Sequence, residues 1–216
     1  MSTTKRNGLF ITFEGSDGCG KSTQMRLLAE RLRAAGRQVV ETAEPGGTRI
    51  GNQIRAILLD SKNQELYPTA EMLLYFASRA QNMDELIFPA LAADSIVLSD
   101  RFTDSTLAYQ GAGRGLGRDV IMQLHDIAVR GRNPDLTICI DIDLETSLRR
   151  AHARNRTTPG KDERRMDEQA KEFHERVRQA YRDLAAAEPE RIRMIDGRAD
   201  RRVVEERIWE VVQRYV

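Results

Sequence analysis

The chain has 216 residues, of which 40% are hydrophobic and 31% charged, and its formal net charge is +1. These proportions fit a folded globular protein that buries its own core, and they exclude a disordered or fibrous chain. The even charge balance argues against a strongly basic nucleic-acid-binding protein. No apolar run approaches the roughly 18 residues of a membrane span, and the N-terminus holds no apolar signal core. The only cysteines, Cys19 and Cys139, are far apart in sequence, which favours a reducing cytoplasm. Together with the charge balance and the lack of long apolar runs, this leads us to expect a cytoplasmic protein without membrane or nucleic-acid partners.

Short apolar runs alternate with helical patterns along the chain. The runs predict strands at residues 9–13, 39–42, 96–99, 136–140 and 192–195. Apolar residues at helical spacing predict helices at 23–35, 50–59, 69–93 (with a kink at Pro89), 119–129, 145–154, 168–187 and 203–212. A short helix is expected at 103–109, before a glycine-rich stretch at 111–117. The alternation predicts an α/β fold: a five-stranded parallel sheet with helices on both faces, in one domain over residues 1–216.

The strongest motif lies between the first strand and the first helix. Eight residues match the pattern G-x-x-x-x-G-K-[ST]: Gly15, Ser16, Asp17, Gly18, Cys19, Gly20, Lys21 and Ser22. Glycines let the backbone curl so that successive N–H groups point at one anion, and the following helix adds its positive end. Lys21 is expected to reach the β- and γ-phosphates of a nucleoside triphosphate, and the Ser22 hydroxyl to bind Mg²⁺.

This motif alone leaves open a kinase, a switch GTPase and an ATP-driven motor. The chain has no N-K-x-D motif for reading guanine, and it is short for a motor. A small kinase is therefore favoured. For the Mg²⁺ carboxylate, two strands end in aspartate, Asp100 and Asp141. We favour Asp100, because Arg101 follows it and places a cation at the same strand end.

Several segments in a fixed order resemble bacterial thymidylate kinases. They are Phe13-Glu14-Gly15, the phosphate loop, Glu44-Pro45-Gly46-Gly47-Thr48, Leu74-Tyr75-Phe76-Ala77-Ser78-Arg79, Asp100-Arg101-Phe102 and residues 105–113. The resemblance extends from about residue 9 to residue 196. It implies a P-loop kinase fold, Mg²⁺, a homodimer, and transfer of the γ-phosphoryl group of ATP to dTMP. The products would be ADP and dTDP, on the route to dTTP by de novo and salvage synthesis.

The resemblance also implies which residues bind dTMP. Phe76 and Arg79 are three apart on a predicted helix, so an aromatic ring and a guanidinium would share one face toward the thymine. Periodicity alone favours Phe76 as an ordinary core residue, and the resemblance reverses that interpretation. The other implied contacts are Asp17, Glu44, Arg101 at the acceptor phosphate with Arg49 and Arg55 assisting, Ser105, Tyr109 and Gln110.

The catalytic residues implied are Asp17, Lys21, Arg101 and an arginine of a helical lid at about 150–167. Some relatives carry an arginine within the phosphate loop where this chain has Gly18, so the stabilising charge would come from the arginine-rich residues 149–165. An arginine in this role contributes about 10³ to 10⁵ in rate. Arg165 in Arg165-Met166-Asp167 resembles the lid segment of the family, and Arg154 and Arg156 are further candidates.

Two alternatives stay open at this point. One is a P-loop kinase for another monophosphate or a small hydroxylated acceptor, and the other is a nucleotide-binding switch or scaffold without transfer activity. Dependence of ADP release on the acceptor separates all three functions.

Overall fold

The computed structural model describes residues 8–157 and 164–216, leaving out the side chains of residues 152 and 154–157. In this part of the chain, one parallel sheet has the strand order β2-β3-β1-β4-β5. The strands are β1 (Phe10–Glu14), β2 (Val39–Ala43), β3 (Ile96–Asp100), β4 (Leu136–Asp141) and β5 (Ile192–Asp196). All five predicted strands are confirmed, and each extends one residue further at its carboxyl end than expected. The added residue is acidic in every strand except β2.

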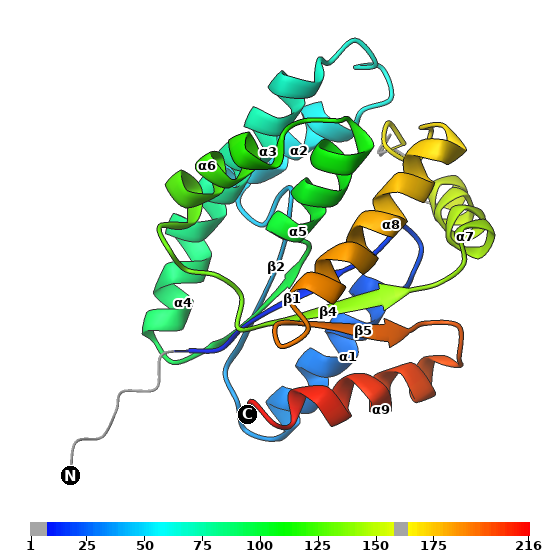
Figure 1. The fold of residues 1–216 in the computed structure, drawn as a ribbon. Helices are drawn as coiled ribbons and strands as arrows, with labels where there is room; N and C mark the ends of the chain where they lie inside the picture. The colour runs from blue at the N-terminus through cyan, green and yellow to red at the C-terminus, as the bar shows by residue number, and fades with distance from the viewer. Residues whose placement is uncertain (1–7, 158–163) are drawn as a thin grey trace.

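Helices connect the strands and cover both faces of the sheet, as predicted (Figure 1). The α-helices are α1 (Lys21–Ala34), α2 (Arg49–Leu59), α3 (Pro68–Asn82), α4 (Phe88–Ala92), α5 (Thr103–Thr106), α6 (Arg118–Val129), α7 (Leu144–Thr157), α8 (Lys171–Ala187) and α9 (Arg201–Val212). Two π-helical segments, η1 (Met83–Ile87) and η2 (Leu107–Gly113), continue α3 and α5. Among the described residues, no helix is long and apolar enough to cross a membrane.

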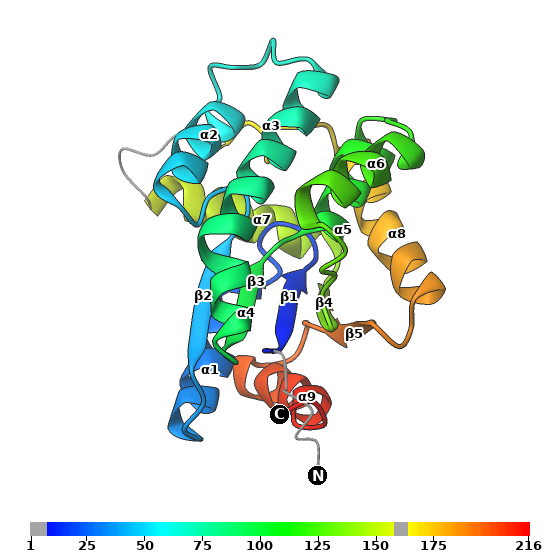
Figure 2. The same cartoon turned by 90° about the vertical axis from the view of Figure 1, so that its left-hand side faces the viewer.

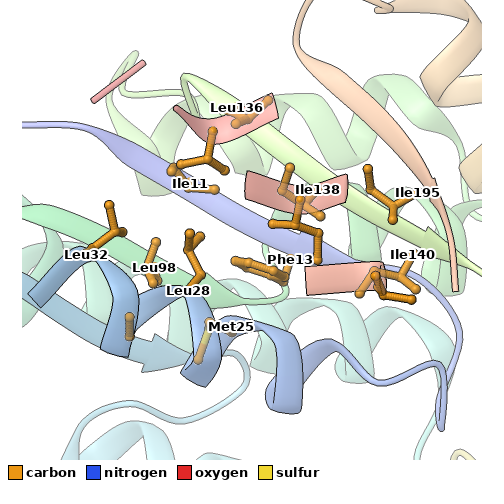
Figure 3. Packing of buried hydrophobic residues seen from close by; sticks show 14 of the residues in the cluster. Ile11, Phe13, Met25, Leu28, Leu32, Leu98, Leu136, Ile138, Ile140 and Ile195 are labelled. Carbon is orange, nitrogen blue, oxygen red and sulfur yellow. The ribbon is translucent and has the colours of Figure 1, made fainter. Parts of the chain in front are cut away.

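Alternating side chains of β1 divide the core into two layers. Ile11 and Phe13 pack with α1 and α9, together with alternate residues of β4 (Figure 3). Phe10 packs on the opposite face with α3 and α6. Figure 2 shows α1 and α9 on one side of the sheet, with α3, α6 and α8 on the other. By the two-residue period of a strand, Thr12 and Glu14 share the face of Phe10, so a carboxylate at the end of β1 points toward α8.

The structure differs from the expectation in two helical regions. The predicted helix 69–93 is interrupted by η1 just before Pro89, because proline has no N–H to continue the helical hydrogen bonds and a π-turn absorbs the break. The glycine-rich stretch after residue 109 begins as helix rather than loop, since η2 runs to Gly113. There a Cβ would lie 2.5 Å from the ring of Phe173. This glycine therefore permits close packing of α8 on η2.

All five strands are parallel, so their carboxyl ends meet at one edge of the sheet. The chain turns in opposite directions from β1, with β3 on one side and β4 on the other. Ligands of open α/β sheets bind at the carboxyl edge where the strand order reverses. The phosphate-loop motif begins at this point.

Candidate active site

A tight loop joins β1 to α1 at the carboxyl edge of the sheet. Gly15, Gly18 and Gly20 have φ angles of 125°, 77° and 103°, a region that side chains rarely adopt. A Cβ on Gly18 would lie 2.4 Å from the carbonyl oxygen of Ser147, so α7 packs directly on the loop. The Ser147 hydroxyl also donates to the Asp17 carbonyl at 2.5 Å. The predicted loop, residues 15–22, thus has the curled backbone that binds phosphate.

Lys21 is the first residue of α1 and is buried. Its Nζ donates to the carbonyl oxygens of Gly15 and Ser16, both at 2.9 Å. The ammonium group therefore lies at the loop, next to the positive end of a helix of 14 residues. A polyphosphate bound here meets a lysine, a helix N-terminus and backbone N–H groups together.

The two predicted Mg²⁺ ligands are in contact. The Ser22 hydroxyl donates to Oδ2 of Asp100, which ends β3. Asp141, the other strand-end aspartate, instead accepts from Arg178 and Arg182 of α8, each at 2.7 Å. A hydroxyl and a carboxylate are hard oxygen ligands, and Mg²⁺ usually takes one or two protein oxygens and completes its shell with phosphate and water. The Ser22–Asp100 pair therefore fits Mg²⁺ beside the phosphate loop.

Arg101 is the centre of a hydrogen-bond network directly after β3. Its φ is +74°, in the left-handed region that side chains rarely adopt. Its guanidinium donates to Asp17 Oδ1 at 2.7 Å, to Ser105 at 2.9 Å, and to Tyr109 and Tyr181 at 3.1 Å each. Burial opposes its charge, but the carboxylate of Asp17 raises the pKa of Arg101 above its ordinary value. A permanent cation thus lies next to the phosphate loop.

A second buried arginine, Arg79 of α3, lies deeper in the cleft. Its Nε donates to Glu44 Oε2 at 2.7 Å, and both terminal nitrogens lie 3.1 Å from the Thr106 hydroxyl. The guanidinium is 4.8 Å from the ring centre of Phe76 and 5.0 Å from that of Phe102. These contacts fix the fork of Arg79 in one orientation, as recognition of a planar base requires.

Of the two neighbouring aromatic residues on α3, Tyr75 lines the cavity, whereas Phe76 does not, although its ring contacts the Arg79 guanidinium. Tyr75 lines the cavity together with Arg79. Phe76 is buried and packs with Phe10, Met72 and other residues of the core. Residues four apart share a helix face as well as residues three apart do. Periodicity therefore fits both aromatic residues, and the structure favours the core interpretation of Phe76.

Gln110 and Arg55 lie at the sides of the cleft. Gln110 Nε2 donates to Glu71 Oε1 at 2.8 Å, and Arg55 Nη1 donates to the Pro45 carbonyl at 2.9 Å. Both side chains line the same cavity as Arg79.

Arg165 occupies a different position from the other predicted residues. Its side chain is 1% exposed, and Nη1 lies 2.6 Å from Glu71 Oε2. Nε donates to the Leu58 carbonyl at 2.5 Å. Its neighbours Met166 and Asp167 line the cavity, whereas Arg165 itself does not. A role for Arg165 in transfer stays a prediction. Part of the predicted lid, residues 158–163, and the side chains of Arg154 and Arg156 lie outside the described residues.

One cavity of about 1070 Å³ connects these groups. This volume is at the upper end of the range for small-molecule sites. It is lined by eleven of the predicted residues: Asp17, Lys21, Ser22, Glu44, Arg55, Arg79, Asp100, Arg101, Ser105, Tyr109 and Gln110. The arrangement places the phosphate loop, the Ser22–Asp100 oxygens and two fixed arginines around one space, as phosphoryl transfer between two anions requires.

Glu14 is a member of this network that sequence reasoning left without a role. The carboxyl group accepts from the backbone N–H of Phe102 at 2.7 Å and from the hydroxyls of Ser105 at 2.6 Å and Tyr181 at 2.8 Å. Burial, followed by the charge of Asp104, raises the pKa of Glu14 to about 7. The available signal was an acidic residue at the end of an otherwise apolar strand. Tyr181 had no signal, because it is one apolar-face residue of α8.

The fold and this site define a P-loop phosphotransferase. A family model described as "Thymidylate kinase" matches residues 13–208. The chain is 53% identical over 193 residues to a thymidylate kinase of Citrifermentans bemidjiense, covering 89% of this chain and 86% of that one. It is 52% identical over 190 residues to the enzyme of Geobacter sulfurreducens, covering 88% and 89%.

A solved structure agrees with these sequence matches. The crystal structure of thymidylate kinase from Ehrlichia chaffeensis superposes with a TM-score of 0.78 at 34% identity, covering 96% of this chain and 100% of that chain. The chain belongs to the thymidylate kinase family.

Proposed function

We propose that this enzyme transfers the γ-phosphoryl group of ATP to dTMP, giving ADP and dTDP, a step toward dTTP. The observation that carries the proposal is the single cavity in which the phosphate loop and the Ser22–Asp100 pair face Arg101 and Arg79. Membership of the thymidylate kinase family supports the choice of acceptor.

The residues divide into a donor side and an acceptor side. On the donor side, the loop N–H groups and Lys21 hold the polyphosphate. Ser22 and Asp100 would hold Mg²⁺, which when bound neutralises charge on the phosphate oxygens. On the acceptor side, Arg101 binds the monophosphate and positions one of its oxygens in line with the γ-phosphorus. Asp17 keeps Arg101 in place through the 2.7 Å ion pair.

The base and sugar occupy the deeper part of the cavity. Tyr75 offers its ring to the face of the thymine, and Arg79 donates to a carbonyl oxygen at the base edge. Glu44 orients Arg79 through their buried ion pair. Tyr109 donates its hydroxyl to Asp17 at 2.8 Å and lines the cavity. In this proposal its ring occupies the place of a 2′-hydroxyl, and deoxyribose is preferred.

The remaining charge stabilisation comes from the arginine-rich segment 149–165. Arg150 is near the loop, since its Cβ lies 3.1 Å from the Cβ position of Gly18. Arg165 reaches the transferring phosphoryl group only if it leaves Glu71. Closure of the lid at about 150–167 over bound nucleotides would bring these arginines to the reacting atoms.

An acceptor panel tests the function. ADP release is measured with Mg²⁺ and ATP against dTMP, dUMP, UMP, CMP, AMP and GMP, with Lys21→Ala as the inactive control. We expect kcat/KM to be highest for dTMP and transfer to vanish in Lys21→Ala without loss of fold. Higher kcat/KM for another monophosphate would assign a different kinase, and hydrolysis independent of acceptor would assign a switch.

We also propose a homodimer and a cytoplasmic location. A homodimer is supported by exposed apolar side chains on α3 and α6, namely Leu73 at 49%, Val120 at 49% and Ile127 at 74% exposure. Light scattering on Ile127→Asp, expected to be monomeric, tests this surface. A reducing cytoplasm suits two buried free thiols, Cys19 and Cys139.

A further inference from the structure

The two ends of the Gln110 amide lie in different surroundings. Nε2 donates to Glu71 at 2.8 Å. The side chain is 1% exposed and lines the cavity. Among the described residues, no donor bonds Oε1 of Gln110. This oxygen is also absent from the set of fully buried polar atoms that lack a partner, so it is accessible from the cavity. The amide therefore keeps its oxygen for a ligand in the cavity.

Glu71 determines this orientation because a carboxylate only accepts hydrogen bonds. Turning the Gln110 amide over would bring its oxygen against the Glu71 oxygens. Glu71 is fully buried, and Arg114 at 3.0 Å and Arg165 at 2.6 Å pair with it. Burial opposes ionisation, but hydrogen bonds from Arg114 and Gln110 and the charge of Arg165 hold the pKa of Glu71 below its ordinary value.

The fixed amide oxygen lies near a fixed donor. Arg79 is bonded to Thr106, and Gln110 is one helical turn further along the same segment. Arg79 and Gln110 both line the cavity. The pocket thus offers a guanidinium donor and an amide acceptor together. Thymine and uracil present the complement, a carbonyl oxygen next to a ring N–H. Cytosine presents the reverse, an amino group next to an unprotonated ring nitrogen.

We propose that Glu71 is a positioning residue for base specificity: it locks the Gln110 amide with its oxygen toward the base, so that the site accepts oxo-pyrimidine monophosphates and rejects aminopyrimidine ones. This role rests on the proposed function. A free amide would rotate and donate to the ring nitrogen of cytosine, so the lock is what excludes dCMP at this position.

The test compares kcat/KM for dTMP and dCMP. In Glu71→Gln, either amide orientation is allowed, and the ratio of the two kcat/KM values falls by at least about tenfold. In the double variant E71Q/Q110E, the exchanged carboxylate again accepts from the amide and presents an oxygen to the base. The ratio returns to within about threefold of wild type, and the negative charge near Arg114 and Arg165 is restored.

Arg114→Met is the matched control, because it removes a partner of the same carboxylate without freeing the Gln110 amide. It lowers the melting temperature and leaves the ratio within about twofold of wild type. An unchanged ratio in folded Glu71→Gln overturns the proposal, as does an equal fall in Arg114→Met. If Glu71→Gln does not fold, Glu71→Asp gives the same comparison, since it keeps the charge but withdraws it from Gln110. The acceptor ranking of wild type tests the proposed function separately.

Discussion

Replacing Arg165 by alanine separates two roles for this residue, one in phosphoryl transfer and one in holding the structure together. Its ion pair with Glu71 joins side chains that are 1% and 0% exposed at 2.6 Å. Breaking a buried pair from one side costs about 3 to 5 kcal/mol. Glu71 keeps Arg114 as a partner, so we expect about 3 kcal/mol. For a chain of this size, this lowers the melting temperature by about 6 to 12 °C.

Arg164→Ala is the matched control. Arg164 is half exposed, and its Nε lies 3.8 Å from Glu168. An exposed pair of this kind contributes about 0 to 1 kcal/mol. Thermal melts of both variants are compared with kcat and KM for dTMP. Melting of Arg165→Ala at the wild-type temperature would refute the reasoning from the buried pair. A large loss of kcat at unchanged stability would support the transfer role predicted from the sequence.

Other predictions concern the cation site, the base pocket and the buried carboxyl group. Asp100→Asn raises the Mg²⁺ concentration for half-maximal rate about tenfold or more, because an amide replaces the carboxylate beside Ser22; an unchanged Mg²⁺ titration would remove Asp100 from the site. Tyr75→Ala raises KM for dTMP with little change in melting temperature, whereas Phe76→Ala costs about 3 to 5 kcal/mol of stability; the reverse pattern in melts and kinetics would return the stacking role to Phe76. The pKa of Glu14 is raised from 4.5 to about 7, so the folded state holds a proton that the unfolded state releases. The contribution of Glu14 to the stability of the folded state is complete below about pH 4.5 and is lost as pH rises to about 7. Glu14→Gln removes this pH dependence. In denaturant titrations, the fall in the free energy of unfolding from pH 5 to pH 8 must then be smaller in this variant than in wild type.

The sequence predicts the fold well because each strand lies in a parallel sheet covered on both faces. Such strands are mostly apolar along their whole length. The runs ending at Phe13, Ser99 and Ile140 show this pattern, with only a Thr or Ser among apolar residues. The phosphate loop can also be predicted from the sequence, because its glycines and Lys21 lie within one short segment. The Ser22–Asp100 contact is harder to predict, because the two residues are far apart in sequence. Asp100 is favoured over Asp141 because Arg101 follows it.

Other site features depend on tertiary contacts that spacing does not encode. Tyr75 and Phe76 differ by one position on a helix, and periodicity fits either of them beside Arg79. Glu71 and Gln110 meet only because α3 and η2 pack together. Arg165 was placed by its family motif, which says nothing about its pairing with Glu71. The sequence shows which side chains could take part in the site, whereas tertiary packing determines which of them are in contact.

The adjacency of Asp100 and Arg101 at the end of β3 has a consequence for the spacing of the two proposed half-sites. Asp100 and Arg101 are joined by one peptide unit, so their Cα atoms are about 3.8 Å apart. In the proposed function, Asp100 binds the cation of the donor and Arg101 the phosphate of the acceptor. The two proposed half-sites are therefore joined by a single peptide bond, and we expect a one-residue insertion between Asp100 and Arg101 to shift one relative to the other.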